Sequence, residues 1–326
     1  MKVYRFEKLA ELCGMSVPVV QSGMGGVAGP CLAAAVSNAG ALGSVGLYRH
    51  EPREINTLID ITESMTNRVI AVNFVPMVLS ENDLAARVEA IRSRSKPPII
   101  TFFGLPSDTI LDCCFEFTKV GVQVGSLEDA QRAIGAGVHF VVLQTIGAGG
   151  HHLGGLDLDG SRDTLRNIKN PDDIPILRAG GIATGADLLQ TLEDGFSGAL
   201  CGTVFAATHE SFAHPIYKNK ILCSKADDTK ITDAFSIGWH THKHRVIRNR
   251  TCDKTLPSTT IGTATYFGRD FPIPRYSVAV PTEATKGAIE EMALYAGVAC
   301  DHITEIKAAR EIIASFEEVL SRSNIQ

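Results

Sequence analysis

Eight short apolar runs recur through the first 204 residues, and this recurrence limits the chain to very few folds. The runs cover residues 17–22, 41–46, 69–75, 97–104, 120–125, 140–146, 174–180 and 198–204. Nearly every residue in them is apolar, where a half-exposed strand would alternate. Such continuous runs are typical of parallel strands that are covered on both faces.

Helical patterns fill the intervals between these runs. Residues 30–40 have a proline at the start and a glycine at the end, while Ser126 and Thr184 are the expected N-caps of 126–137 and 184–195. Eight strand–helix units in about 200 residues predict an α/β fold, the (β/α)8 or TIM barrel. A doubly wound open sheet is the alternative, and the number of strands favours the barrel.

The pattern changes after residue 211. Residues 212–280 mix basic and polar residues with prolines but keep aromatic and isoleucine side chains. We therefore expect a barrel over 1–211 and an inserted, smaller cap or substrate subdomain over 212–280. Helical periodicity returns in 283–297 and 302–320, which predicts C-terminal helices over 281–326, the last packing back on the barrel.

Composition narrows the class of partner. The net charge is −5 without a long basic run, so neither nucleic acid nor an anionic membrane is expected as the main partner. The eight cysteines form no CxxC pair, which favours a reducing compartment. No signal-like or membrane-length apolar stretch is present. These features predict a cytoplasmic protein with a small-molecule substrate.

Active sites of such barrels lie at the C-terminal ends of the strands. Gly180 and Gly181 follow the seventh run, and Gly202 and Thr203 follow the eighth. Glycine turns leave backbone N–H groups open, and a helix that follows adds its positive end. The two turns therefore predict a phosphate site. The alternative is that these glycines only form tight turns.

Other strand ends carry uncharged groups. Gly23, Gly25 and Ala28 fit a loose dinucleotide pattern, but the second run ends without an acid for a ribose, so we favour a backbone that lies flat against a ring system. Three amides end the third, fifth and sixth runs, namely Asn73, Gln123 and Gln144. Such amides suit a neutral heterocycle with carbonyls and ring nitrogens, as an isoalloxazine has. For Asn73, the alternative is a core amide bonded to the neighbouring strand.

The loop after the sixth run reads IGAGGHHLGG over 146–155. Its glycines allow a ligand to approach closely, and imidazole titrates near neutrality, so His151 or His152 is a candidate general base. Neighbouring residues in an extended loop point in opposite directions, so we expect only one of them to serve. Two surface histidines in a mobile loop are the alternative.

Three further histidines alternate in WHTHKH, at positions 240, 242 and 244. They would share one face of a strand, which would suit a metal. No Asp, Glu or Cys nearby completes a site, and Lys243 and Arg245 would repel a cation. We therefore predict no metal and a polar lid face.

Five ordered segments resemble one known family. QSGMGGVAGPCLAAAVSNAGALGSVG, AVNFVP, LQTIGAGGHHLGG, RAGGIATGADL and CGTVFAATHES are similar in order and spacing to the FMN-dependent nitronate monooxygenase (2-nitropropane dioxygenase) family over residues 17–211. The resemblance implies a barrel with FMN at its mouth and His151, not His152, as the base. It also implies flavin or phosphate contacts from Gly23, Met24, Asn73, Gln144, Gly149, Gly150, Gly181, Gly202 and Thr203.

The chain departs from the family pattern at two positions. Gly147 stands where members often have an acid, and Gln123 stands where many have a lysine near the pyrimidine edge of the flavin. A neutral amide stabilises an anionic reduced flavin less than a lysine does. Both changes bear on the substrate that is accepted.

The resemblance implies oxidative denitrification of nitronates or nitroalkanes with O2. One alternative is an NAD(P)H-dependent FMN reductase that acts on an enoyl thioester, as an enoyl-acyl-carrier-protein reductase does, or on a quinone. Another is a non-catalytic sensor of a phosphate ligand. The use of NAD(P)H and a homodimeric state stay open at this point.

Overall fold

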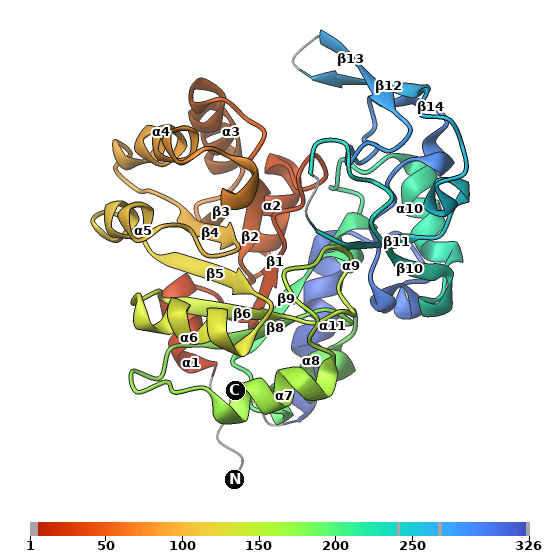
Figure 1. Cartoon of the computed structure of the whole chain (residues 1–326). Helices are drawn as coiled ribbons and strands as arrows, with labels where there is room; N and C mark the ends of the chain where they lie inside the picture. The colour runs from red at the N-terminus through yellow and green to blue at the C-terminus, as the bar shows by residue number, and fades with distance from the viewer. Residues whose placement is uncertain (1–5, 240–241, 267–268, 324–326) are drawn as a thin grey trace.

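The centre of the molecule is a parallel sheet of eight strands that closes into a barrel (Figure 1). A computed structural model describes residues 6–239, 242–266 and 269–323. The barrel strands are β1 (Val19–Gln21), β2 (Gly43–Gly46), β3 (Ile70–Phe74), β4 (Ile99–Phe103), β5 (Val120–Val124), β6 (Phe140–Gln144), β8 (Ile176–Ala179) and β9 (Gly198–Cys201). Each of the eight predicted runs contains one of these strands.

The strands pair in the order β1-β9-β8-β6-β5-β4-β3-β2, and every pair is parallel. The ends of this order meet, because Val20 of β1 bridges Leu42 beside β2 and the Gln21 N–H donates to the Leu42 carbonyl at 2.9 Å. The predicted (β/α)8 barrel is therefore confirmed.

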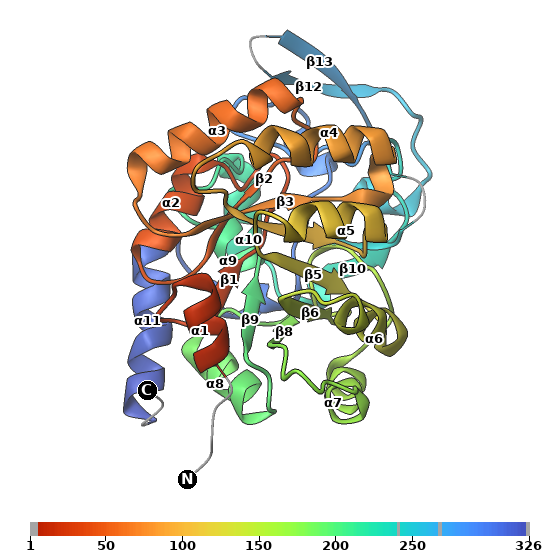
Figure 2. The ribbon, with the colours of Figure 1, turned by 90° about the vertical axis from the view of Figure 1, so that its left-hand side faces the viewer.

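Helices cover the outside of the barrel (Figure 2). They are α2 (Pro30–Asn38), α3 (Pro52–Met65), α4 (Glu81–Arg92), α5 (Asp108–Phe115), α6 (Leu127–Gly135), α7 (Leu158–Asn167), α8 (Gly185–Glu193) and α11 (Ala309–Arg322), with a short α9 (Thr203–Ala206). Ser126 and Thr184 cap α6 and α8 as predicted, each accepting a hydrogen bond from a first-turn N–H. No helix in the described ranges combines the length and apolarity that crossing a membrane requires.

Apolar side chains fill both faces of the barrel wall. Inside, Val20, Leu42 and Phe140 form one cluster with Leu9 and Cys13 of α1 (Glu7–Cys13), which closes the N-terminal end. Outside, the strands pack on α3 to α6 through a second cluster. This double burial is the reason that the strand sequences are apolar at nearly every position.

Residues 212–280 form α10 (Pro215–Cys223), β10 (Thr229–Thr232), β11 (His244–Ile247), β12 (Thr260–Tyr266) and β13 (Arg269–Pro274). β11 lies between β10 and the two-residue strand β7 (Gly150–His151), so this segment pairs directly with the histidine loop. β12 and β13 form a hairpin that projects from the body (Figure 1). The domain limits at 211 and 280 stay a prediction.

The helix expected over 283–297 is wrong. This stretch contains β14 (Lys286–Gly287), which pairs with β12, and the single 3-10 turn Ile289–Glu291. Gly287 has φ +118°, and a Cβ there would lie 2.3 Å from the Ile261 carbonyl oxygen, so the backbone follows the neighbouring strand. In 302–320 the helix begins only at Ala309. α11 packs against α2 and α8.

Candidate active site

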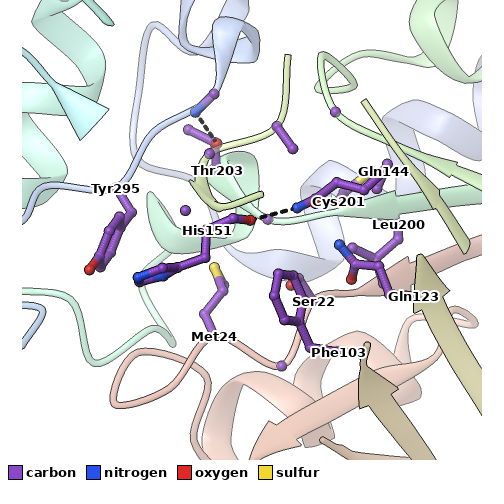
Figure 3. A pocket seen from close by; sticks show the side chains of 18 of the residues that line it. Ser22, Met24, Phe103, Gln123, Gln144, His151, Leu200, Cys201, Thr203 and Tyr295 are labelled. Atoms are coloured by element: carbon purple, nitrogen blue, oxygen red, sulfur yellow. Dashed lines mark hydrogen bonds between the residues drawn. The ribbon is translucent and has the colours of Figure 1, made fainter. Parts of the chain in front are cut away.

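Every predicted site residue borders one cavity at the C-terminal end of the barrel. Its lining includes Gly23, Met24, Asn73, Gln123, Gln144, Gly149, Gly150, His151, Gly180, Gly181, Gly202 and Thr203. Figure 3 shows the side chains of His151 and Tyr295 on one side of this cavity and those of Gln123 and Gln144 on the other. The structure thus brings these residues together, whereas their individual roles stay predictions.

His151 is the histidine that borders the cavity, and its side chain is buried. Its Nε2 atom is enclosed and has no hydrogen-bond partner among the described residues. Its ring stacks on Trp239 with centroids 3.8 Å apart and planes within 7°. Burial, together with His244, His242, His152 and Arg49, lowers the pKa of His151 to about 2. The imidazole is therefore neutral near pH 7, and such a ring can accept a proton.

His152 points the other way, as the alternation in the loop predicted. Its Nε2 atom lies 2.9 Å from the Ala148 carbonyl oxygen, and its backbone N–H donates to the Lys243 carbonyl at 2.9 Å. The residue does not border the cavity. Its imidazole bonds back to its own loop, so of the two histidines only His151 borders the cavity.

Glycine is required at several positions of the loop, for a different structural reason at each. A Cβ on Gly149 would lie 2.5 Å from the Gly297 nitrogen, and one on Gly154 would lie 2.0 Å from the Gly125 carbonyl oxygen. Gly150 has φ +79°, which favours glycine. The backbone on either side of His151 is therefore fixed by close approach of other backbone segments.

The three amide side chains differ in whether their hydrogen-bonding groups already have partners in the protein. Gln144 clamps the loop: its Nε2 donates to the His151 carbonyl and its Oε1 accepts from the Leu153 N–H, both at 2.8 Å. Asn73 donates to the Thr101 hydroxyl at 3.0 Å, which is the neighbouring-strand bond considered as its alternative. The Gln123 amide forms no hydrogen bond within the described ranges, so it is the most available of the three to a ligand.

The two glycine turns offer open backbone donors. Gly180 and Gly181 have φ +108° and +75°. The N–H groups of Gly181, Gly202 and Thr203 form no backbone hydrogen bond within the part of the chain that the structure describes. The Thr203 hydroxyl accepts from the Gly297 N–H at 3.0 Å, which ties the turn to the C-terminal segment (Figure 3). These donors suit an anion.

The expected contribution of the following helix is wrong for α8. Asp187 in its first turn accepts from the N–H groups of Ala183 and Thr184, at 3.0 and 2.9 Å. That carboxylate already occupies the positive end of the helix and would repel a second anion. An anion would therefore be held by the turns themselves.

An aromatic wall completes the cavity and was not predicted from the sequence. Tyr48, Phe103, Trp239 and Tyr295 border it, from four separate segments. Trp239 is the single tryptophan of the chain, but no periodic pattern places it near His151. Gln21 also borders the cavity; as a polar residue that ends an apolar run, it could have been found by the rule that selected Gln123.

The polar lid face expected for the WHTHKH histidines is wrong for His244. This side chain is fully buried, its ring centroid lies 5.0 Å from that of His151, and its Nε2 accepts from the Phe235 N–H at 3.2 Å. His240 lies outside the described residues. A search of the described ranges finds no cluster of metal-ligating side chains.

Acidification is expected to destabilise the fold through the buried histidines. The pKa of His151 is lowered to about 2 and that of His244 to about 4, mainly by burial. Below pH 6.5 the unfolded chain binds protons that the folded chain does not, so stability falls as pH falls. Between pH 7 and 5 each group should cost roughly 2 kcal/mol. Urea unfolding at several pH values measures this.

His151→Gln supplies the control for that experiment. The variant removes one of these groups, so the unfolding free energy should fall by roughly 2 kcal/mol less between pH 7 and 5 than it does in the parent. Equal slopes in the parent and the variant would show that His151 is not held neutral.

Comparisons with known proteins agree with this fold. A family model described as nitronate monooxygenase matches residues 7–318. A probable nitronate monooxygenase of Staphylococcus aureus (strain JH9) is 26% identical over 268 residues, covering 70% of this chain and 76% of that protein.

Two solved structures share the fold. FabK from Thermotoga maritima has a TM-score of 0.80 at 24% identity and covers 99% of this chain and 98% of its own. Nitroalkane oxidase from Streptomyces ansochromogenes has a TM-score of 0.76 at 22% identity, covering 98% and 99%. Since the family model spans nearly the whole described chain, the chain belongs to the nitronate monooxygenase family and is an oxidoreductase enzyme.

Proposed function

We propose that this enzyme uses FMN to oxidise nitronates and nitroalkanes with O2, giving a carbonyl compound and nitrite. The observation that carries the proposal is His151, which borders a cavity with open backbone donors and whose buried Nε2 has no partner among the described residues. A buried polar atom without a hydrogen-bond partner destabilises the folded protein unless a bound ligand supplies that partner. Membership in the nitronate monooxygenase family supports the same reaction class.

The residues present fit a flavin nucleotide. The open N–H groups of Gly181, Gly202 and Thr203 would hold the phosphate, and the free amide of Gln123 would hydrogen-bond to the ring system. Gly23 and Met24 would lie against the rings. No Asp, Glu, Lys or Arg side chain of the described residues lines the cavity, so a bound phosphate would rely on backbone donors. When bound, FMN would supply electron acceptance and reaction with O2.

His151 performs the proton step in this proposal. A neutral nitroalkane in the cavity gives its α-proton to the imidazole, which is neutral near pH 7. A pKa of about 2 makes this ring a weak base, so the nitronate anion that forms beside it must stabilise the imidazolium. Tyr295 and Trp239 exclude water from one side of the ring. A substrate supplied as the nitronate anion has already lost this proton and does not need the base.

Trp239 positions His151 in this scheme, which can be tested directly. In Trp239→Leu the stack is lost and water reaches the imidazole, so kcat/KM for a neutral nitroalkane should fall about tenfold. The pKa of His151 should also rise toward 6.5, which adds an acidic limb to the pH profile. Trp239→Phe keeps an aromatic face and should resemble the parent. An unchanged profile in Trp239→Leu would contradict a positioning role.

A reductase that acts on an enoyl thioester or a quinone is the second candidate. The aromatic wall favours it, because an apolar acyl chain or quinone ring would pack there as well as a nitroalkane does. Anaerobic mixing of the purified protein with NADH or NADPH separates the two functions. Rapid bleaching of the flavin absorbance favours the reductase. Slow bleaching with turnover of a nitronate favours the proposed reaction, and a colourless protein that FMN cannot reconstitute contradicts both.

A further inference from the structure

A second cavity adjoins the active-site cavity. Gly25 borders both of them. The second cavity has a volume of about 650 Å³ and lies between residues 46–54, which connect β2 to α3, and strand β13 of the projecting hairpin. A ligand seated at the barrel mouth could extend into it past Gly25.

Three arginines line this second cavity from both of its walls. Arg49 comes from the connection between β2 and α3, Arg53 from the first turn of α3, and Arg269 from β13. The Arg49 guanidinium lies 5.2 Å from the ring centroid of Tyr48, a residue of the active-site wall. Arg49 therefore stands at the boundary between the two cavities.

The same cavity is also lined by two carboxylates, and each of them has a partner. Glu51 lies 3.7 Å from Arg87, and Glu54 accepts from the Glu51 N–H at 2.9 Å and lies 3.7 Å from His50. Arg53 and Arg269 form no salt bridge within the described ranges. Burial lowers the pKa of His50, so it adds little charge near pH 7. Three guanidinium groups against two carboxylates leave the cavity lining with a net charge of +1 near pH 7.

The two cavities differ sharply in charge. The active-site cavity has no Asp, Glu, Lys or Arg among its described lining residues, whereas its neighbour presents three guanidinium groups. Guanidinium groups match phosphate oxygens in geometry as well as charge. An elongated ligand with a phosphate at one end and a neutral reacting group at the other would satisfy both cavities.

We propose that the second cavity binds the phosphate of such an elongated substrate or cosubstrate, through Arg49, Arg53 and Arg269. The neutral end then reaches the His151 side of the mouth. This proposal rests on the proposed function only for the reaction at that end. A dinucleotide and a coenzyme thioester both carry suitable phosphates, and the experiment distinguishes them.

The test uses the flavin-loaded protein and calorimetric titration with inorganic pyrophosphate, NADPH and coenzyme A. Pyrophosphate and at least one of the two carriers should bind the parent, more weakly at high salt. Arg53→Gln/Arg269→Gln should weaken that binding about tenfold for each arginine lost. The matched control, Arg132→Gln/Arg166→Gln, removes two exposed arginines from α6 and α7 and should bind as the parent does.

The carrier that binds identifies the source of the phosphate. Absence of binding by all three probes, or equal affinity in the Arg53→Gln/Arg269→Gln protein and the parent, would overturn the proposal. Turnover of a small nitronate, which has no phosphate, is measured in the same proteins. If that turnover is absent while phosphate binding needs the arginines, the proposed reaction fails and the anion site stands.

Discussion

Replacing His151 with alanine should lower turnover of a neutral nitroalkane by roughly 10²–10⁴-fold while flavin stays bound. The His151 imidazole borders the cavity and is neutral near pH 7, so it can take up a proton whose positive charge the nitronate anion then stabilises. The flavin contacts that we propose come from glycine turns and amides, which this substitution leaves intact. Steady-state rates and the visible spectrum of the purified variant measure both effects.

Two comparisons isolate the proton step. The same variant should oxidise a preformed nitronate at a rate close to that of the parent, because that substrate needs no base. His209→Ala changes an exposed histidine outside the cavity and should leave both rates unchanged. Equal loss with the nitroalkane and the nitronate would show that His151 acts on binding or folding and would remove it from the proton step.

Replacing Gly149 with alanine should nearly abolish activity without touching a side chain of the cavity. The added Cβ would lie 2.5 Å from the Gly297 nitrogen and 2.6 Å from the Ala296 carbonyl carbon, both of them backbone atoms. Relief of that overlap must move the loop that carries His151. A displacement of about 1 Å can cost 10²-fold in rate, and overpacking costs about 1–3 kcal/mol of stability. Urea unfolding and kcat/KM give the two values.

Gly155→Ala is the matched control in the same loop. A Cβ at Gly155 meets no atom within 4 Å, and its φ is not positive. The unfolding free energy should therefore stay within about 0.5 kcal/mol of the parent, with full activity. Full activity in Gly149→Ala would show that the contact with residues 296–297 does not set the position of His151.

The barrel could be predicted because its signal is local. Apolar runs, N-caps such as Ser126 and Thr184, and the glycines after β8 and β9 each define a backbone conformation from neighbouring residues. The region after residue 211 offered weaker signals. Apolar spacing over 283–297 suits a helix, but Gly287 is held at φ +118° by the backbone of Ile261, a contact that no local pattern shows.

The candidate site was also predictable only in part. The sequence gathered glycines, amides and two histidines at strand ends, and the structure places every predicted site residue around one cavity. The hydrogen-bond partners of these side chains could not be predicted from the sequence. Gln144 hydrogen-bonds to the histidine loop, and Asn73 hydrogen-bonds to Thr101. Of the three amides, Gln123 is the one without a hydrogen-bond partner within the described residues.

By itself, the sequence determined the barrel, the ends of its strands and the short loop that carries the candidate base, because backbone conformation follows from local residue types. The tertiary structure decided that His151 faces the cavity while His152 bonds to Ala148. It also placed β11 beside β7 and Trp239 on the His151 ring. Burial and the pKa of His151 depend on these contacts between distant segments, and such contacts exist only once the chain has folded.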